Sequence, residues 1–347
     1  MKSLQTIVIT MGEPKGIGPE IIIKALASSQ IQDLLPESNF LIIGSGKILS
    51  QTARNVNADF NPVKLSTPVL SSQESGAGNI FLFDPKTGSE SRNGLEYILS
   101  AIEFLQSNKA AALVTAPVSK QAIQETGYSF VGHTELLAQK TLSRKVTMMF
   151  VTPKLKVSLV TTHIAYKKLL LYLTSDKILS TIEQTEEGLR KYFGISQPKI
   201  AVCGLNPHSG EGKTFGKEET TIIKPTIEIA KPRKIICEGP FPADSIFYRA
   251  MQTPKGPRLG ESNEKPSVND FDAVISLYHD QGLIPIKTLA FFEAVQVTLG
   301  LPFIRTSPAH GVAFDIAGKG IANSSSMIEA IKLAVSMAKR NNSLFAD

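Results

Sequence analysis

Short apolar runs rich in β-branched residues alternate along the chain with longer amphipathic stretches. The apolar runs predict strands with both faces buried, because such strands present no polar side. The predicted strands are Thr6–Thr10, Phe40–Ile43, Ala111–Thr115, Thr147–Val151, Val157–Thr161, Lys199–Cys203, Ile235–Cys237, Ala273–Leu277 and Val295–Leu299. The predicted helices are Pro19–Ser28, Gly94–Gln106, Thr134–Leu142, Asp176–Tyr192, Glu218–Ala230 and Ser326–Ala338. This alternation predicts an α/β fold with a mostly parallel sheet.

Length and composition narrow the class of protein. A chain of 347 residues suits two domains, and 42% hydrophobic with 20% charged residues suits a soluble globular protein with a real core. The net charge is +6, but the basic residues are dispersed and aromatic residues are few, which argues against a nucleic-acid-binding stripe. A mild positive excess suits a small anionic substrate equally well. The stretch Met251–Asn269, rich in Pro, Gly, Lys and Glu, predicts a surface insertion.

Cysteine usage and the apolar runs bear on location. Cys203 and Cys237 both lie in strand-like runs, which predicts buried thiols in a reducing cytoplasm rather than a disulfide. The apolar stretch near Met1 is too short for a signal peptide, and no run approaches the roughly 20 residues that span a bilayer. We therefore expect a cytoplasmic protein without membrane contact.

Three of the five histidines follow predicted strands. His163 comes after Val157–Thr161, His208 after Lys199–Cys203, and His279 after Ala273–Leu277. Ligands of open α/β sheets bind at the carboxyl ends of the strands. Three imidazoles brought to that edge would hold a divalent metal, and zinc or cobalt suits such ligands, whereas added oxygen ligands admit magnesium or manganese. The alternative is that three histidines end their strands independently.

A glycine-rich turn, Thr10-Met-Gly-Glu-Pro-Lys-Gly-Ile-Gly-Pro-Glu20, joins the first predicted strand to the first helix. Its glycines, Gly12, Gly16 and Gly18, would allow backbone to approach an anionic ligand, or would simply form a tight turn. Neither standard nucleotide motif is present. A dinucleotide fingerprint at Gly44-Ser-Gly46 fails because Leu49 replaces its third glycine, and a P-loop ending at Thr214 fails because Pro207 stands where a glycine is required.

Further polar residues lie next to predicted strands and helices. His133 and Thr134 begin a helix and would either bind an anion or only cap it. Asp280 would ligate a metal or orient His279. Asp244 would be a ligand, a base or a helix cap. Lys287 and Arg305 flank Val295–Leu299, where a cation pair suits a phosphate or carboxylate, although isolated surface charges are the common alternative.

Together these motifs resemble a known family. The resemblance rests on the segments Met11–Glu20, Val114–Val118, Gly132–Glu135, Thr161–His163, Cys203–His208, Tyr278–Gly282 and Leu299–Thr306. The chain is similar to the 4-hydroxythreonine-4-phosphate dehydrogenases of pyridoxal phosphate biosynthesis from about residue 6 to residue 340. The resemblance implies two α/β/α-layered domains of the isocitrate/isopropylmalate dehydrogenase type with an interdomain cleft, not an ordinary Rossmann fold. We expect one domain from 1–135 plus 295–347 and the other from 136–294.

The resemblance also implies roles for residues. His163, His208 and His279 would bind the metal, and His133, Thr134, Lys287, Gln296 and Arg305 would bind the substrate. The loop His310–Asn323 is similar to an adenosine-binding loop, so NAD would bind without a dinucleotide fingerprint, and Asp315 at the ribose would favour NAD over NADP. The cofactor-binding set is Gly12, Gly16, Gly18, His310, Gly311, Asp315, Ile316 and Asn323. A homodimer would complete each active site at the subunit interface.

Our hypothesis is a metal-dependent oxidation by NAD of 4-phosphooxy-L-threonine at C3, followed by decarboxylation to 3-amino-2-oxopropyl phosphate. Lys287 or Asp244 would transfer the proton. The alternatives from other classes are a three-histidine zinc hydrolase and a non-catalytic phosphometabolite-binding protein.

The chain departs from the family pattern at Glu13, where Asp is usual, at Lys15, and at Gln296, where Asn is usual. The segment Ala290–Ala294 is also bulkier than its usual glycine-rich counterpart. These departures leave open a related dehydrogenase acting on threonate or erythronate 4-phosphate.

Overall fold

The computed structural model describes residues 4–67, 79–85, 93–107, 110–252 and 271–343. The chain forms two compact units, one from Met1–Arg144 together with Phe292–Asp347, and the other from Lys145–Phe291. Both ends of the chain thus belong to the first unit. The predicted surface insertion at 251–269 lies outside the described residues from 253 onward.

The first unit contains a sheet in the order β3-β4-β2-β1-β5-β12-β11. Its strands are β1 (Gln5–Thr10), β2 (Ser38–Ile43), β3 (Val63–Leu65), β4 (Ile80–Phe83), β5 (Ala112–Thr115), β11 (Val295–Leu299) and β12 (Ile304–Pro308). All neighbours are parallel except β11 and β12. The central strand β1 pairs Ile7 with Phe40 on one side and with Ala112 on the other, and all three side chains are buried. Apolar runs therefore occupy the middle of the sheet, as the sequence predicts.

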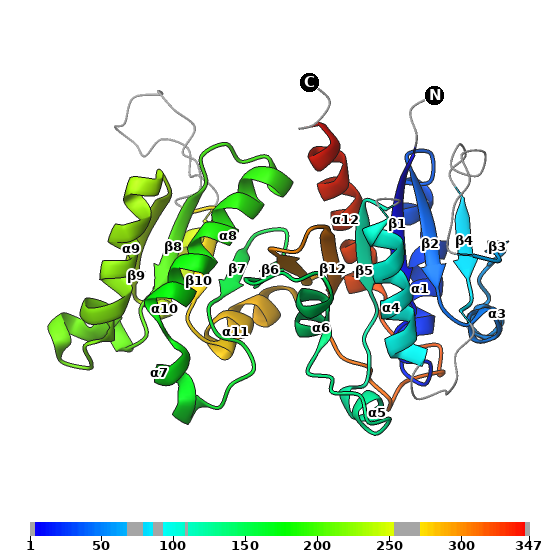
Figure 1. Cartoon of the computed structure of the whole chain (residues 1–347), viewed down its shortest axis with the longest axis horizontal. Coiled ribbons are helices and arrows are strands. Elements are labelled where there is room, and N and C mark those ends of the chain that lie inside the picture. Colours follow the sequence, from blue (N-terminus) through cyan, green and yellow to red (C-terminus); the bar gives the residue numbers. More distant parts are fainter. Residues whose placement is uncertain (1–3, 68–78, 86–92, 108–109, 253–270, 344–347) are drawn as a thin grey trace. The chain divides into compact units, whose positions relative to one another are not determined.

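Two helices of the first unit, α4 (Asn93–Gln106) and α12 (Ser325–Ser343), contact the strands of this sheet (Figure 1). The other described helices of the unit are α1 (Gly18–Ala27), α2 (Ser29–Gln32), α3 (Gly46–Asn55), α5 (Lys120–Gln124) and α6 (His133–Lys140). The apolar side of α1, with Ile21, Ile22 and Leu26, is buried. Pro19 stands at the start of α1, where its missing N–H costs no hydrogen bond.

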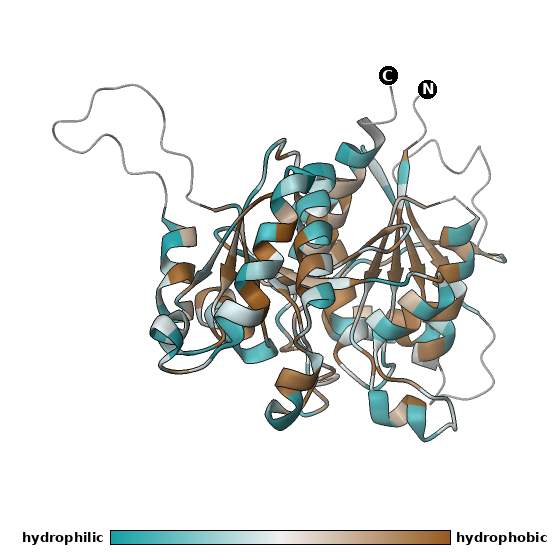
Figure 2. Ribbon diagram, turned by 60° about the vertical axis from the view of Figure 1, so that its left-hand side comes forward, coloured by the Kyte–Doolittle hydropathy of each residue, from teal (hydrophilic) through white to brown (hydrophobic). Residues whose placement is uncertain are grey.

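The second unit contains a sheet in the order β6-β7-β10-β8-β9. Its strands are β6 (Thr147–Val151), β7 (Lys156–Leu159), β8 (Lys199–Cys203), β9 (Ile236–Phe241) and β10 (Ala273–Ser276). The last four strands in this order are parallel to one another, and β6 is antiparallel to β7. Figure 2 shows the strands as mostly apolar ribbons, while the helices carry both apolar and polar positions. The expected mostly parallel sheet is confirmed in both units.

Helical segments surround the second sheet. They are η3 (Tyr166–Lys168), α7 (Leu169–Tyr172), α8 (Ser175–Phe193), η4 (Pro207–Lys213), the π-helical turn η5 (Glu219–Ile223), α9 (Lys224–Ala230), η6 (Lys231–Arg233), α10 (Ala243–Met251) and α11 (His279–Ala290). The long helix α8 begins with a cap, because the Thr174 hydroxyl accepts a hydrogen bond from the Lys177 amide. It ends at Gly194 in the left-handed conformation. Among the described residues, the helices lack the length and apolar content needed to cross a membrane.

Two elements near the expected site differ from the sequence prediction. His279 and Asp280, which follow the predicted strand Ala273–Leu277 with no helix predicted there, form the first turn of α11. The helix contains Gly282 and Pro285, which weaken its local signal, but Leu283 and Ile286 are buried beside the sheet. Strand β12 is also missing from the prediction, because its polar residues interrupt the apolar pattern.

Candidate active site

Three histidines follow three adjacent parallel strands of the second unit. His163 comes after β7, His279 after β10 and His208 after β8, and the order of these strands is β7-β10-β8. The carboxyl ends of parallel neighbours lie at one edge of a sheet, so the topology brings all three segments to that edge. Of the three rings, those of His163 and His279 make contact, with centroids 5.5 Å apart.

Asp280 orients the ring of His279. Its Oδ1 lies 2.7 Å from His279 Nδ1, and its Oδ2 accepts a hydrogen bond from the Tyr166 hydroxyl. The bond from Tyr166 and then that from His279 lower the pKa of Asp280, while the bond to Asp280 raises the pKa of Tyr166. A carboxylate at this position accepts the Nδ1 proton, and Nε2 of His279 would then be the ring atom available to a metal.

A cavity of about 280 Å³ contains this pair. Its lining is Thr162, His163, Ile164, Ala165, Tyr166, Leu169, Tyr278, His279 and Asp280. Sequence reasoning missed Tyr166, whose ring packs edge-on against that of Tyr278 at 5.9 Å. Two imidazoles with a carboxylate behind one of them form a donor set that fits zinc or cobalt.

His208 lies in a different setting. It belongs to η4, is exposed, and its ring contacts that of Phe215 with centroids 6.4 Å apart. Within the part of the chain that the structure describes, groups of three His, Cys, Asp or Glu side chains arranged for a metal are absent. The three-histidine set stays a prediction, of which the structure brings His163 and His279 together.

Arg305, on β12, is a buried charge of the first unit, with 2% of its surface exposed. Its Nη1 donates to Gln296 Oε1 and to Thr298 Oγ1 (3.1 Å), and its Nη2 donates to Thr115 Oγ1 (2.6 Å). These acceptors are neutral, and Nε has no partner among the described residues. Burial lowers the pKa of Arg305 to about 9, and Glu135 acts in the opposite direction. A buried guanidinium with a donor to spare is an anion-binding arrangement.

His133 and Thr134 begin helix α6 and lie near this guanidinium. Burial, followed by the charges of Arg305 and Lys120, holds the pKa of His133 well below its usual value, so the imidazole is neutral. Its Nε2 is buried and has no partner among the described residues. Thr134 is buried as well. An unmatched imidazole nitrogen and a buried threonine at a helix N-terminus suit an anion.

Gln296 lies on β11 beside Arg305 rather than in the open. Its amide oxygen accepts from Arg305 Nη1 and from Ser307 Oγ at 3.0 Å, and its Nε2 donates to Thr298 at 3.1 Å. The amide thus orients the guanidinium. Its predicted contact with substrate stays a prediction.

The glycine-rich turn lies against the predicted cofactor loop. Ile17 donates a backbone hydrogen bond to Val312 at 2.9 Å. A Cβ on Gly12 would come within 2.4 Å of the Pro117 carbonyl oxygen, and one on Gly18 within 2.3 Å of the Met11 carbonyl oxygen. These two glycines are therefore required by the turn itself, whatever ligand it binds. Glu13, in the same turn, is buried, and burial raises its pKa.

A cavity of about 340 Å³ is lined by residues of both the glycine-rich turn and the predicted cofactor loop. It is lined by Pro14, Lys15, Gly16, Pro19, Glu20, Thr52, Asn55, Val56, Ala317, Gly318 and Gly320. Of the predicted cofactor residues, Gly16 lines it, whereas Gly311, Asp315 and Asn323 are exposed in the loop that borders it, and His310 and Ile316 are partly exposed. A glycine-lined cavity next to a helix N-terminus fits a nucleotide.

The predicted proton-transfer residues are both exposed. Asp244 lies in the first turn of α10, which follows β9 at the same sheet edge as the three histidines. Lys287 lies on α11, with its Nζ 5.6 Å from the ring centroid of Phe291. Neither residue lines the cavity of His163 and His279.

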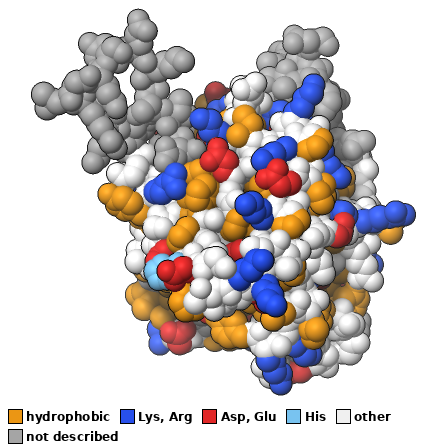
Figure 3. Space-filling view, turned by 90° about the vertical axis from the view of Figure 1, so that its left-hand side faces the viewer, with side chains coloured by type: hydrophobic (Ala, Val, Ile, Leu, Met, Phe, Trp, Pro, Cys, Tyr) orange, Lys and Arg blue, Asp and Glu red, His pale blue; other side chains and the backbone are white. Residues whose placement is uncertain are grey.

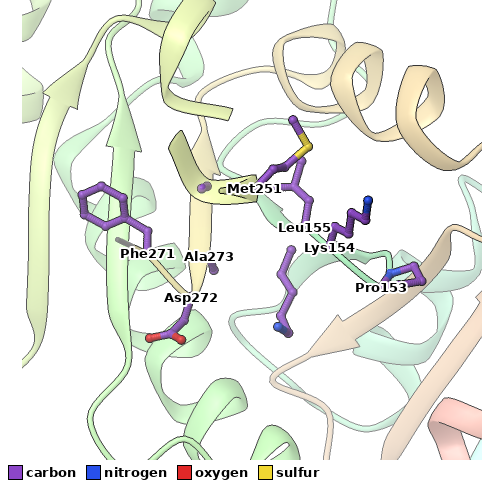
Figure 4. A pocket seen from close by; sticks show the side chains of 9 residues that line it. Pro153, Lys154, Leu155, Met251, Phe271, Asp272 and Ala273 are labelled. Carbon is purple, nitrogen blue, oxygen red and sulfur yellow. The ribbon is translucent and has the colours of Figure 1, made fainter. Parts of the chain in front are cut away.

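Figure 4 shows a further cavity of the second unit, of about 200 Å³, at the amino ends of β7 and β10. Lys154 and Asp272 line it, and the predicted site residues do not. On the face drawn in Figure 3, lysines and arginines are scattered among apolar and acidic side chains. The described basic side chains on that face do not form a stripe of the kind that binds nucleic acid.

Comparisons with known proteins give a consistent result. A family model described as pyridoxal phosphate biosynthetic protein PdxA matches residues 37–334. The chain is 39% identical to a 4-hydroxythreonine-4-phosphate dehydrogenase of Sulfurihydrogenibium sp. (strain YO3AOP1), covering 94% of this chain and 96% of that relative. It is 37% identical to a D-threonate 4-phosphate dehydrogenase of Cupriavidus necator, covering 97% and 98%.

Solved structures agree with the sequence relatives. The crystal structure of 4-hydroxythreonine-4-phosphate dehydrogenase from Klebsiella pneumoniae has a TM-score of 0.80 and 33% identity, covering 96% of this chain and 99% of that one. An isocitrate dehydrogenase from Methylococcus capsulatus has a TM-score of 0.50 at 14% identity, covering 98% and 87%, which shows the fold alone. The predicted fold class is confirmed.

Proposed function

Because the chain belongs to the family of pyridoxal phosphate biosynthetic protein PdxA, we propose that it oxidises 4-phosphooxy-L-threonine at C3 and decarboxylates the product to 3-amino-2-oxopropyl phosphate. The relatives that carry the name 4-hydroxythreonine-4-phosphate dehydrogenase match nearly the whole chain. The structural observation that carries the proposal is the buried Arg305, which has neutral acceptors and a spare Nε.

The substrate's anionic groups match the cationic and donor groups of the first unit. Arg305 supplies a planar donor set for a phosphate or carboxylate, and the neutral His133 and Thr134 donate from the start of α6. Thr115, Thr298 and Gln296 hold the guanidinium in place before the substrate arrives. This preorganisation reduces the entropic cost of binding.

The proposed metal ligands are His163, His208 and His279, and the proposed cofactor is NAD. When bound, NAD supplies the hydride acceptor, and the divalent metal supplies a Lewis acid at the C3 oxygen. Asp280 would keep the Nδ1 proton on His279, and Nε2 would hold the metal. Lys287, on the same helix as His279, and Asp244, after β9, are the proposed proton-transfer residues.

The proposed cofactor site is the cavity between the glycine-rich turn and the loop His310–Asn323. Exposed Asp315 would accept a hydrogen bond from a ribose 2′-hydroxyl and repel a 2′-phosphate, which favours NAD over NADP. We place the reaction in the cytoplasm, where the two free cysteines, Cys203 and Cys237, stay reduced.

We also propose a homodimer. Tyr166, Leu170 and Leu171 are 64%, 56% and 77% exposed, and they belong to the η3–α7 segment that lines the cavity of His163 and His279. Exposed apolar side chains beside a polar site are typical of a surface that a partner covers. A second copy of the chain is the proposed partner.

D-threonate 4-phosphate is the alternative substrate, because several close relatives are named for it and Gln296 replaces the usual Asn of the family. The test measures NADH formation by absorbance with 4-phosphooxy-L-threonine, D-threonate 4-phosphate and D-erythronate 4-phosphate side by side. We expect the first compound to have the highest kcat/KM and a chelator to stop the reaction.

The other classes give different results in the same assay. A zinc hydrolase would release phosphate or another product without NAD. A binding protein would show affinity for the three compounds without turnover. Either result would reject the dehydrogenase proposal.

A further inference from the structure

The loop that carries His208 has an unusual backbone. His208, Ser209 and Glu211 have φ angles of 50°, 53° and 36°. Gly210 and Gly212, with 81° and 65°, and Lys213, with 87°, complete six consecutive residues with positive φ. Residues with a Cβ avoid positive φ because the Cβ clashes with the neighbouring carbonyl oxygen. Such a turn persists only where surrounding contacts hold it, and such backbones cluster at functional sites.

Glu219 provides those contacts. It is 4% exposed in the π-helical turn η5. Its Oε1 accepts hydrogen bonds from the backbone amides of Leu205 (2.9 Å) and Asn206 (2.7 Å), and its Oε2 accepts from Asn206 Nδ2 (2.9 Å). These donors directly precede Pro207 and His208. A buried carboxylate with three donors is a strong anchor, because its charge strengthens each bond.

The far side of the loop also lies against this carboxylate. A Cβ on Gly210 would come within 2.7 Å of Glu219 Oε2, so the chain passes closely around the carboxylate before and after His208. Both oxygens of Glu219 are already engaged by donors of the loop. Glu219 is therefore placed to hold the loop rather than to bind a ligand itself. π-Helical turns often occur beside functional sites.

We propose that Glu219 is a positioning residue that holds the left-handed turn so that His208 is presented to the metal. The proposal rests on the proposed function, because it assumes that His208 is a ligand. Without the carboxylate, the amides of Leu205 and Asn206 lose their acceptor, and the turn relaxes toward negative φ. His208, which is two residues beyond Asn206, then leaves the sheet edge.

The test compares Glu219→Ala and Glu219→Gln with Glu218→Gln. Glu218 is the matched control, because it is the adjacent carboxylate and also accepts a hydrogen bond from the side-chain Nδ2 of Asn206, at 2.8 Å. Unlike Glu219, it does not accept from the backbone amides of Leu205 and Asn206. Glu219→Gln and Glu218→Gln each remove one negative charge at neighbouring positions. An effect of net charge alone would therefore be equal in both.

Two quantities are measured on the full chain. The first is hydrogen exchange of the Leu205 and Asn206 amides without added metal. The second is the affinity for zinc, by competition with a chromophoric chelator. We expect Glu219→Ala to exchange faster and to bind zinc about 10- to 100-fold more weakly, Glu219→Gln to lie between, and Glu218→Gln to match the original protein.

Equal losses in Glu219→Gln and Glu218→Gln, or unchanged exchange in Glu219→Gln, would overturn the proposal. If Glu219→Ala fails to fold by circular dichroism, the comparison of the two Gln variants decides the question.

His208→Ala separates this proposal from the metal assignment. If His208→Ala binds zinc normally, the ligand set is wrong, whereas weakened binding in His208→Ala with normal binding in both Glu219 variants rejects the positioning role.

Discussion

Lys24 and Glu20 form an ion pair of 2.8 Å on one face of α1. Together they bind the backbone N–H and C=O groups of Gly320 and Ala322, in the loop His310–Asn323. The Glu20 carboxylate accepts from the Gly320 and Ala322 amides, while Lys24 Nζ donates to the carbonyl oxygens of the same two residues. This ion pair thus ties the proposed cofactor loop to the helix that follows the glycine-rich turn.

Replacement of Glu20 should therefore weaken NAD binding more than catalysis. We expect Glu20→Ala to raise the KM for NAD about tenfold or more with a smaller change in kcat, because the loop loses an anchor far from the reacting atoms. Steady-state kinetics with varied NAD measures this. The control is Glu329→Ala, which removes a similar ion pair with Lys332 from the surface of α12. Equal effects of the two substitutions would reject the role of Glu20.

The contact between Asp280 and His279 predicts a second effect on metal affinity. Asp280→Asn should lower zinc affinity about 10- to 100-fold, because the ring loses the acceptor that fixes its tautomer. Tyr166→Phe should have a smaller effect in the same direction. Chelator competition measures both. Tyr172→Phe is the control, since Tyr172 lies on α7 and keeps its ring contact with Lys177. Unchanged affinity in Asp280→Asn would contradict the orienting role.

Arg305 should not be replaceable by lysine. Arg305→Lys keeps a positive charge but loses the planar donor set that Gln296, Thr298 and Thr115 hold in place. We expect kcat/KM for the phosphorylated substrate to fall about 10- to 100-fold, which corresponds to roughly 1.5–3 kcal/mol for hydrogen bonds to a charged group. Arg54→Lys on the exposed helix α3 is the control and should leave kcat/KM unchanged.

His133 predicts a pH dependence of stability. Burial lowers its pKa in the folded protein well below the value of about 6.5 that it has when unfolded. Between these two values the unfolded state binds more protons, so the free energy of unfolding falls as pH drops below about 6.5, by at most about 1.4 kcal/mol per pH unit. His133→Asn should reduce this loss in urea unfolding at pH 7.5, 6.5 and 5.5. An identical slope in His133→Asn would refute the assignment.

A charged side chain in the exposed apolar segment η3–α7 should disrupt the proposed homodimer. Leu171→Asp should convert a species of twice 37.5 kDa into one of 37.5 kDa in light scattering, because a carboxylate in an apolar interface loses its hydration. Leu142→Asp is the control, because Leu142 is 88% exposed but lies in the other unit. A monomeric original protein would reject the homodimer itself.

Local sequence patterns predicted much of the fold and part of the site. The strands Thr147–Val151 and Lys199–Cys203 agree with β6 and β8 to the residue, because compact apolar runs between turns specify buried strands. Strand β12 was not predicted, because Arg305 and Thr306 interrupt its apolar pattern. Helix α11 was not predicted, because Gly282 and Pro285 weaken its helical signal. His279, expected only to follow the strand Ala273–Leu277, is the first residue of α11.

The sequence by itself determined which segments become strands, that three of those strands are followed by histidines, and to which family the chain belongs. Each of these features depends on short stretches of residues that are neighbours in the sequence. Only the tertiary structure decided that β10 lies beside β7, which puts His279 against His163, and that Arg305 is buried among Thr115, Thr298 and Gln296. Strand order and the partners of a buried charge depend on contacts between residues far apart in the chain, which local periodicity does not encode.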